Sequence, residues 1–508
     1  ILIMKLNFSR SKNSCTLYVQ KSYRDKDGRS TTKTIECLGS LDDIKAKHGC
    51  ADPLEWAQAY VRELTLQEKL GKRKVKVEYA PSKLLEKEGR RSFNGGYLFI
   101  QHLYNQLGLP NICEEISSRH KFEYDLNEIL SRLIYTRILY PGSKASSFQD
   151  SGRFIEQPKF KLENIYRSLS VLSSEADYIQ AQLFKNSKEV INRKTGVIFY
   201  DCTNYFFEIE QADKNSGLRQ YGYSKEHRPN PIVQMGMFMD ASGLPLAFCI
   251  NPGNKSEQQT LIPLEETLNQ KFGLSEFVVC TDGGLSSIEN RKYNSKGNRG
   301  FITVQSLKDN KIASHIQAWA LSKDGWKVKG DNQEYTIDTP ESHLKDSDGN
   351  EITLYKERWI NEKGLEQRII VTFSYKYRTY GRTIRAEQIQ RANNTINNGT
   401  ALNKKKSPND AQRFVKIGCW SDDGTEATKK TASLDQEIID KEERFDGFYA
   451  ICTNLEDNAT EIIKVNSWRW EIEDFFRILK TEFEARPVYL RREDRIIAHF
   501  ITCFISLL

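Results

Sequence analysis

The sequence predicts an α/β fold: a mixed β-sheet interrupted by a β-rich insertion domain and preceded by a β-hairpin and a helical domain. Three observations predict it. Residues 191–308 hold short apolar runs typical of buried strands, with one helical stretch among them. Residues 96–190 carry apolar side chains at helical spacing. A strongly amphipathic stretch, residues 467–480, follows a long segment of strand-like alternation and returns the chain to the sheet.

Composition sets wide limits. The chain has 508 residues, more than one hydrophobic core usually serves, so several domains are expected. Its 75 Lys and Arg against 68 acidic residues give a net charge of +7, which permits a nucleic-acid partner without requiring one. Ten cysteines without a zinc-site spacing fit the reduced thiols of a cytoplasmic protein. No apolar run reaches the ~18 residues of a membrane span and no secretory leader is visible, so we predict no membrane association.

The two ends of the sequence are unusual. The first residue is Ile1 rather than Met, and the last run, residues 500–508, is apolar throughout most of its length. That run is typical of a buried helix that is cut short. Both features are compatible with a sequence trimmed at one or both ends.

The first 95 residues divide into two segments. Residues 1–68 are predicted to form a β-hairpin, with the turn Asp25-Lys26-Asp27-Gly28 between two alternating runs, followed by a helix around Pro53–Leu66. Residues 69–95 are dense in Lys and Arg up to Arg91. They are either a solvated linker or an arm that binds phosphate groups.

The helical domain covers residues 96–190. Apolar residues recur at i, i+3 and i+4 in 97–107, 126–139 and 162–172, and the connections contain Pro110 and Pro141. The domain could hold a helix-turn-helix, but no residue pattern identifies a recognition helix.

Residues 191–308 form the first part of the predicted core. A strand over Val197–Tyr200 ends in Asp201, and a later strand over Phe277–Thr281 is followed by Asp282. The other predicted elements are two strands, a helix and a fifth strand: Ile232–Asp240, Leu244–Asn251, Gln258–Phe272 and Gly300–Val304. Three strands, a helix, a strand and another strand are the order expected of a ribonuclease-H-like domain.

Residues 309–455 are predicted to form the insertion domain, and residues 456–508 the second part of the core. Four segments of the insertion alternate like strands: Trp326–Lys329, Glu351–Tyr355, Gln367–Phe373 and Gly447–Thr453. A charged, helical stretch over 382–397 and the basic loop 404–406 lie among them.

The stretch 467–480 reads as one amphipathic helix. One arc is apolar, and a neighbouring arc holds Arg469, Glu473, Arg477 and Lys480. On its own this is compatible with an ordinary surface helix, whose i,i+4 ion pairs contribute roughly 0.2–0.5 kcal/mol each. The alternative is that Glu473 is a metal ligand and that the three cations bind phosphates, provided that other carboxylates complete the site.

Asp201 and Asp282 are the candidates for those carboxylates. Three clustered carboxylates carry about −3 charge and repel one another unless they are protonated or neutralised. Two divalent cations, Mg²⁺ or Mn²⁺, suit oxygen ligands and, about 4 Å apart, hold the attacking and leaving oxygens of an in-line phosphoryl displacement. Arg469, Arg477 and Lys480 would then bind the flanking phosphates.

These residues carry a resemblance. Asp201 in Phe199–Asn204, Asp282 in Thr281–Ser287, and Arg469-x3-Glu473-x6-Lys480 resemble the DDE motif of bacterial insertion-sequence transposases, more narrowly the group with the Tyr-x2-Arg-x3-Glu-x6-Lys (YREK) signature. Further segments are similar as well: the opening hairpin, Phe93–Gly96, Gly222–Pro229, Gly243–Leu246 and Gly253–Glu257. The signature's Tyr falls on Asn466, which can hydrogen-bond a DNA phosphate but cannot stack.

The resemblance implies a ribonuclease-H-like core with a β-rich insertion between the second Asp and the Glu. It implies binding to the terminal inverted repeats of an insertion sequence, Mg²⁺-dependent cleavage that generates a 3′-hydroxyl and forms a hairpin, and strand transfer into target DNA by a homodimer in a synaptic complex. Residues 1–68 and 96–190 are the expected DNA-binding regions, and the expected location is the bacterial cytoplasm, with the nucleoid.

The same group uses an aromatic residue of the insertion to hold a flipped base. The available residues are Trp319, Trp326, Trp359 and Trp420, and for each of them packing in a core is the alternative.

Two other functions compete with transposition. One is a non-catalytic, decayed or domesticated DNA-binding relative, which the triad argues against. The other is a metal-dependent phosphohydrolase of small molecules with Asp201 as nucleophile. That chemistry usually needs a second acid two residues on, where Thr203 stands.

Overall fold

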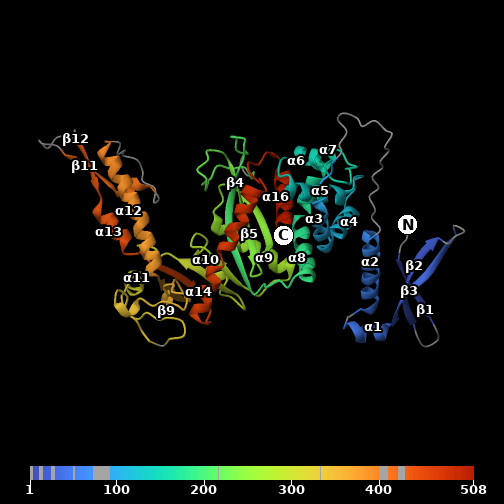
Figure 1. Ribbon diagram of the computed structural model, residues 1–508, viewed down its shortest axis with the longest axis horizontal. Coiled ribbons are helices and arrows are strands. Elements are labelled where there is room, and N and C mark those ends of the chain that lie inside the picture. Colours follow the sequence, from blue (N-terminus) through green and yellow to red (C-terminus); the bar gives the residue numbers. More distant parts are fainter. Residues whose placement is uncertain are drawn as a thin grey trace. The chain divides into compact units, whose positions relative to one another are not determined.

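The computed structural model describes residues 4–10, 15–24, 29–49, 52–71, 92–214, 217–331, 333–399, 410–420 and 429–508. The chain divides into two compact units, Ile1–Arg91 and Ser92–Leu508 (Figure 1). The predicted turn 25–28, the basic segment from residue 72 to 91 and the basic loop 404–406 lie outside the described residues.

The first unit is a three-stranded antiparallel sheet with two helices. Its elements are β1 (Met4–Arg10), β2 (Cys15–Arg24), β3 (Ser30–Ser40), α1 (Leu41–His48) and α2 (Pro53–Gly71), with β2 in the centre of the sheet. Ser40 caps α1 by accepting a hydrogen bond from the backbone N–H of Asp43, whose carboxylate accepts one from the backbone N–H of Ser40. Leu17, Ile44 and Ala57 form the small buried core.

The second unit contains an eight-stranded mixed sheet in the order β6-β5-β4-β7-β8-β13-β10-β9. Its first five strands are β4 (Val197–Phe206), β5 (Ile232–Asp240), β6 (Pro245–Pro252), β7 (Val278–Thr281) and β8 (Gly300–Gln305). β4, β5 and β6 are antiparallel neighbours, whereas β7 and β8 run parallel to β4. Helix α9 (Leu261–Phe272) connects β6 to β7, and α10 (Ile288–Tyr293) connects β7 to β8. This order is consistent with the predicted ribonuclease-H-like fold.

One boundary prediction in this sheet was wrong. Asp201 does not end its strand, because β4 continues to Phe206 and stays paired with β5 as far as Ile232. The apolar run of four residues marks only the stretch of β4 that pairs with β7 as well, from Val197 to Tyr200. Beyond it, the strand has one neighbour and carries polar side chains.

A helical region precedes the sheet in the sequence, as predicted. It consists of α3 (Tyr97–Gln106), α4 (Leu109–Arg119), α5 (Leu126–Leu139), α6 (Lys144–Ser151), α7 (Leu162–Ser174) and α8 (Ala176–Val190). The C-terminal helix α16 (Glu493–Leu507), drawn in red in Figure 1, packs on α5 and α7. Its continuous buried face from Ala498 to Ile505 confirms the interpretation of residues 500–508 as a buried helix.

The segment 309–455 adds strands to the same sheet. β9 (Leu354–Glu362), β10 (Leu365–Phe373) and β13 (Phe448–Thr453) extend it beyond β8 in antiparallel fashion. The other elements are α11 (Ser314–Ala320), the long helix α12 (Tyr375–Asn397), α13 (Gln436–Glu443) and the hairpin of β11 (Val415–Trp420) and β12 (Lys429–Leu434). Short 3-10 turns lie at η1 (Glu257–Gln259), η2 (Pro340–Ser342) and η3 (Ala411–Phe414). In the predicted strand Trp326–Lys329, Trp326 and Lys327 make isolated bridges, and no strand forms.

The stretch predicted as one helix is broken. α14 (Ala459–Ser467) ends at its first residue, α15 (Trp470–Arg477) begins within it, and the π-helical turn η4 (Ile478–Glu482) follows α15. Its apolar face is buried at Ile472, Phe476 and Leu479, whereas Trp468 is exposed. In the part of the chain that the structure describes, no helix has the length and apolar character needed to cross a membrane.

Candidate active site

Asp201 and Asp282 lie on neighbouring parallel strands at the same level. The register pairs Tyr200 of β4 with Thr281 of β7, so the residues that follow, Asp201 and Asp282, are side by side. Parallel strands are about 4.8 Å apart, which brings the two carboxylates into strong electrostatic contact. The backbone N–H of Cys202 donates to Asp201 (2.7 Å), and that of Leu285 donates to Asp282 (3.1 Å).

The environment of Asp201 opposes its negative charge. Burial raises the pKa of Asp201 to about 6, and Asp282 raises it as well, while Lys225 and Arg469 lower it. A carboxyl group in this state gains from any added positive charge. The pair therefore has the electrostatics of a cation-binding site.

Lys225 reaches this site from a loop. Its ammonium group donates to the backbone carbonyl of Cys202 (2.5 Å) and forms an ion pair with Glu257 (3.4 Å). The loop can pack this closely because a Cβ atom at Gly222 would lie only 1.9 Å from the carbonyl oxygen of Gly253. Because Gly222 has no side chain, the segment 222–229 can lie directly against the segment 253–257, which begins at Gly253.

Lys480 approaches Asp201 from the π-helical turn η4. Its ammonium lies 3.5 Å from Glu226, which also pairs with Arg486. Burial and the nearby Lys225 lower the pKa of Lys480 to about 8, while Asp201 raises it. Two lysines therefore lie beside one aspartate, an excess of positive charge that suits a phosphate group.

Glu473 lies on α15 beside Arg469. The guanidinium of Arg469 is 3.5 Å from the Glu473 carboxylate and also lowers the pKa of Asp201, so Arg469 interacts with both acids. The side chain of Glu473 is 60% exposed. Among the described residues, no three His, Cys, Asp or Glu side chains form a group that could hold a metal ion.

A groove runs along the Glu473 side of the site. It has a volume of about 690 Å³, and its lining includes Tyr449, Asn466, Arg469, Trp470 and Glu473. The side-chain amide of Asn466 donates to the hydroxyl of Tyr449 (3.2 Å). Tyr449 is 39% exposed on β13. The phenol hydroxyl of Tyr449 on β13 therefore lies next to Asn466 on α14, the position at which the signature has its Tyr.

Arg477 is not part of this constellation. It pairs with Asp474 (3.2 Å) and lies 3.9 Å from Glu482, on the exposed side of α15. Helical spacing put it on the same arc as Glu473, but its guanidinium pairs with Asp474, and among the described ion pairs none joins it to Glu473.

The four tryptophans of the segment 309–455 differ in exposure. Trp326 is fully buried, and its indole N–H donates to Ser322, so it is a core residue. Trp319 packs in the same core, with Lys356 and Arg358 over its ring. Trp359 is 44% exposed, and the side chain of Trp420 lies outside the described residues.

Residues 206–508, more than half of the chain, match the family model described as Transposase DDE domain. The chain belongs to this family. As a DDE transposase it is an enzyme of DNA cleavage and strand transfer. The matched residues include Asp282 and Glu473, and the match begins five residues after Asp201.

Solved structures of two transposases are similar to this one at a low level. One is the cryo-EM structure of a piggyBac transposase synaptic complex with hairpin DNA, with 8% identity, 81% of this chain and 73% of that chain covered, and a TM-score of 0.34. The other is the Mos1 transposase paired-end complex with the left transposon end, with 10% identity, 47% and 64% covered, and a TM-score of 0.15. No curated protein sequence matches. The assignment therefore rests on the family model.

The donor set of this transposase fits a divalent cation. Asp201 and Asp282 offer carboxylate oxygens at one level of the sheet, the arrangement that hard cations prefer. Glu473 is the third carboxylate of the predicted set, and it is paired with Arg469 instead of with the two aspartates. The three acids are thus of the chemical type that binds a divalent cation.

Sequence reasoning missed two residues of the site. Lys225 lies in the segment 222–229, for which the sequence indicated only a similarity to the transposase group. A lysine three residues after a glycine in such a segment is a signal that could have identified it as a site residue. Tyr449 lies in a strand of the insertion, 24 positions before Glu473, and its neighbour Asn466 gives no sequence signal for it.

Proposed function

We propose that this transposase belongs to the YREK group and acts on the ends of a bacterial insertion sequence. It binds the terminal inverted repeats, cleaves the DNA to give a 3′-hydroxyl through a hairpin, and joins that end to target DNA, as a homodimer in a synaptic complex. It works in the bacterial cytoplasm, with the nucleoid. The observation that carries the proposal is the pair Asp201 and Asp282, in register on parallel strands and surrounded by Lys225, Arg469 and Lys480.

The three acids have one proposed role. Asp201, Asp282 and Glu473 hold two Mg²⁺ or Mn²⁺ ions, which when bound activate the attacking oxygen and stabilise the departing one. Neutralising the carboxylates would remove the mutual repulsion that raises the pKa of Asp201.

The surrounding residues have proposed roles in binding DNA. Lys225 and Lys480 flank Asp201 and would hold the phosphate that is cut, while Arg469 would bind the adjacent phosphate. Asn466 and the Tyr449 hydroxyl would together contact one more phosphate oxygen at the groove. Trp470, which is 58% exposed and borders the same groove, would stack on a base.

The division of labour along the chain stays a prediction. Residues 1–68 and 96–190 would bind the transposon ends, 69–95 would connect them, and 191–308 with 456–508 would form the catalytic core around the insertion 309–455. The basic residues between 69 and 91 suit phosphate contacts that set affinity without reading bases.

The test is cleavage of a linear duplex that carries the terminal repeat, with Mg²⁺. Asp201→Asn, Asp282→Asn and Glu473→Gln should each lower the cleavage rate by about 10³-fold or more, while the gel-shift affinity for the duplex is retained. Asp474→Asn is the matched control, because this carboxylate is adjacent to Glu473 and pairs only with Arg477 among the described residues. Cleavage by all three variants at the wild-type rate would refute the site.

The same assay tests the decayed relative. If the wild-type chain binds the repeat but makes no Mg²⁺-dependent nick, a non-catalytic DNA-binding function replaces the proposal.

A further inference from the structure

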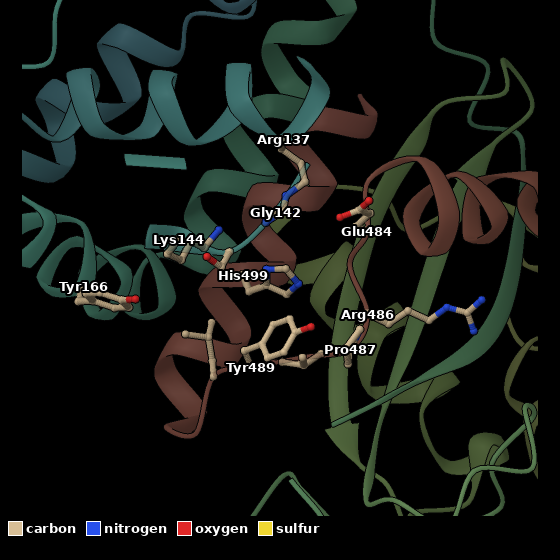
Figure 2. A pocket seen from close by; sticks show the side chains of 12 residues that line it. Arg137, Gly142, Lys144, Tyr166, Glu484, Arg486, Pro487, Tyr489 and His499 are labelled. Atoms are coloured by element: carbon tan, nitrogen blue, oxygen red, sulfur yellow. The ribbon is translucent and has the colours of Figure 1, made fainter. Parts of the chain in front are cut away.

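A second charged cavity lies in the same unit, away from the carboxylates. It has a volume of about 340 Å³ and is enclosed by the end of α5, the start of α6, the loop 484–490 and α16 (Figure 2). Three nitrogen-bearing side chains, those of Arg137, Lys144 and His499, form part of its wall. Figure 2 shows Arg137 and Lys144 approaching each other above the ring of His499.

These three side chains are almost fully buried. Arg137 is 2%, Lys144 is 4% and His499 is 7% exposed. The ammonium of Lys144 has no hydrogen-bond partner in the described structure, and neither has Nε of Arg137. Arg137 uses another nitrogen to donate to the carbonyl of Phe483 (2.8 Å), and Nε2 of His499 lies 3.2 Å from the carbonyl of Ala485.

Among the described ion pairs, none balances the buried charges of Arg137 and Lys144. Glu484 is the acidic residue of the cavity lining, it is exposed, and among the described ion pairs none joins it to Arg137, Lys144 or His499. Burial and Arg137 lower the pKa of Lys144 to about 7, with the Cys503 thiol acting against them. Burial, Arg137 and Lys144 lower the pKa of His499 as well. A buried, unpaired ammonium is unfavourable unless an anion accompanies it.

The start of α6 adds to the positive potential of the cavity. α6 starts at Lys144 and is capped by Ser143, so the positive end of this helix also faces the cavity lining. Free donors therefore come from Arg137 on α5 and Lys144 on α6, while the ring of His499 on α16 forms part of the wall. Arg486 and the exposed Tyr489 stand at the other end of the lining, where a sugar or base could follow the phosphate.

We infer that the cavity formed by Arg137, Lys144 and His499 binds a phosphate group, and that in the working enzyme this group is a backbone phosphodiester of DNA. The phosphate part rests on the cavity alone, whereas the DNA part rests on the proposed function. Phe483 and Ala485, whose carbonyls contact Arg137 and His499, follow directly after the turn that carries Lys480. Binding here would therefore steady the backbone beside the catalytic site.

The first experiment uses the full chain without DNA or divalent metal. Sodium phosphate should raise Tm by about 2–4 °C relative to sodium chloride at equal ionic strength, a shift expected for moderate ligand binding. Lys144→Met should abolish this response. In phosphate-free buffer at pH 6, the same substitution should raise Tm, because it removes a buried charge without leaving a hole. Lys161→Met, at an exposed lysine in the same helical region, is the matched control and should keep the response.

The second experiment identifies the source of the phosphate. For a duplex with the terminal repeat, the slope of log K against log salt should be smaller in magnitude by about 0.9 for Lys144→Met, the value for one lost phosphate contact. If phosphate no longer stabilises the variant but the slope is unchanged, DNA is not the source. If phosphate does not stabilise the wild-type chain, the cavity is not a phosphate site. Neither outcome depends on whether the enzyme cleaves DNA.

Discussion

The carboxylate site and the cavity formed by Arg137, Lys144 and His499 both bury charges of one sign close together, but they compensate these charges differently. At the carboxylate site, Asp201 and Asp282 are adjacent, but Lys225, Arg469 and Lys480 come from other elements to surround them. In the cavity, Arg137, Lys144 and His499 are adjacent, and among the described ion pairs none joins them to Glu484, the acid of the lining. The carboxylate site pairs charges of both signs before any ligand arrives, whereas the buried positive charge of the cavity is unpaired in the described structure.

The difference shows what each site needs. Each pKa shift favours the neutral form of its group. The pKa of Asp201 is raised to about 6, and the pKa of Lys144 is lowered to about 7. At the carboxylate site a metal ion and a phosphate can bind side by side, because acids and cations alternate. In the cavity, the binding of a single anion would compensate the buried positive charge. We therefore expect that removing one charge from the carboxylate site lowers the rate of cleavage and leaves the fold intact. Removing a charge from the cavity should instead raise the stability of the fold.

Among substitutions of the side chains that surround the carboxylates, Lys225→Met should have the largest effect. Lys225 is the cation that lowers the pKa of Asp201 most, and it would hold the phosphate that is cut, so its loss should reduce the rate of Mg²⁺-dependent cleavage by about 10²-fold. The measurement is single-turnover cleavage of the terminal-repeat duplex. Lys194→Met, at an exposed lysine just before β4, should cleave at the wild-type rate.

An unchanged rate in Lys225→Met would remove the cation from the carboxylate site. The positive charge of Lys225 would then serve only to stabilise Asp201 in the fold, and this part of the comparison would fail.

Asp201→Asn tests the electrostatic strain directly, without metal. The folded-state pKa of about 6 lies above the ordinary value of 3.8, so ionisation of Asp201 opposes folding as pH rises from about 4 to 6 and above. The asparagine side chain of the variant cannot ionise, so the variant should be more stable than wild type by about 1–3 kcal/mol at pH 8 and equal to it near pH 4. Urea unfolding in EDTA at both pH values measures this.

Asp240→Asn is the contrasting control. Asp240 is fully buried and forms an ion pair with the buried guanidinium of Arg193. Its neutralisation leaves that cation unpaired and should destabilise the chain by about 3–5 kcal/mol. If Asp201→Asn also destabilises at pH 8, Asp201 is held by a structural ion pair and the carboxylate site does not need an added cation.

Much of the fold was readable from the sequence because buried strands and helices carry their own periodicity. The strand Ile232–Asp240 and the helix Leu126–Leu139 were predicted with the bounds that the structure has. The break before α15 was not predicted. Trp468 and Arg469 keep nearly helical backbone angles, so the 3.6-residue pattern continues across the turn and hides it.

The site was only partly readable, for a different reason. Asp201, Asp282 and Glu473 can be found from local patterns and a known spacing. Lys225 and Tyr449 act through contacts that only the sheet order creates, and so do Arg137, Lys144 and His499, which are separated by up to 362 positions along the chain (499 minus 137). No window of sequence contains the information that these groups meet.

The smallest effect is expected for Tyr449→Phe. The phenol hydroxyl accepts a hydrogen bond from Asn466. Burial raises the pKa of Tyr449, while Asn466 and Arg469 act in the opposite direction, so this hydroxyl lies near the guanidinium of Arg469. Loss of one neutral phosphate contact should lower the cleavage rate about 5-fold, equivalent to about 1 kcal/mol. Since no charge is lost, the salt dependence of DNA binding should stay as in wild type, in contrast to Lys144→Met.

Tyr377→Phe is the matched control, because Tyr377 is 68% exposed and lines the same groove without contacting Asn466 in the described hydrogen bonds. Asn466→Ala should match Tyr449→Phe if the two side chains act as one unit, and the double variant should then be no slower than either. Additive losses would mean that Asn466 alone contacts the phosphate and that Tyr449 supports the groove wall.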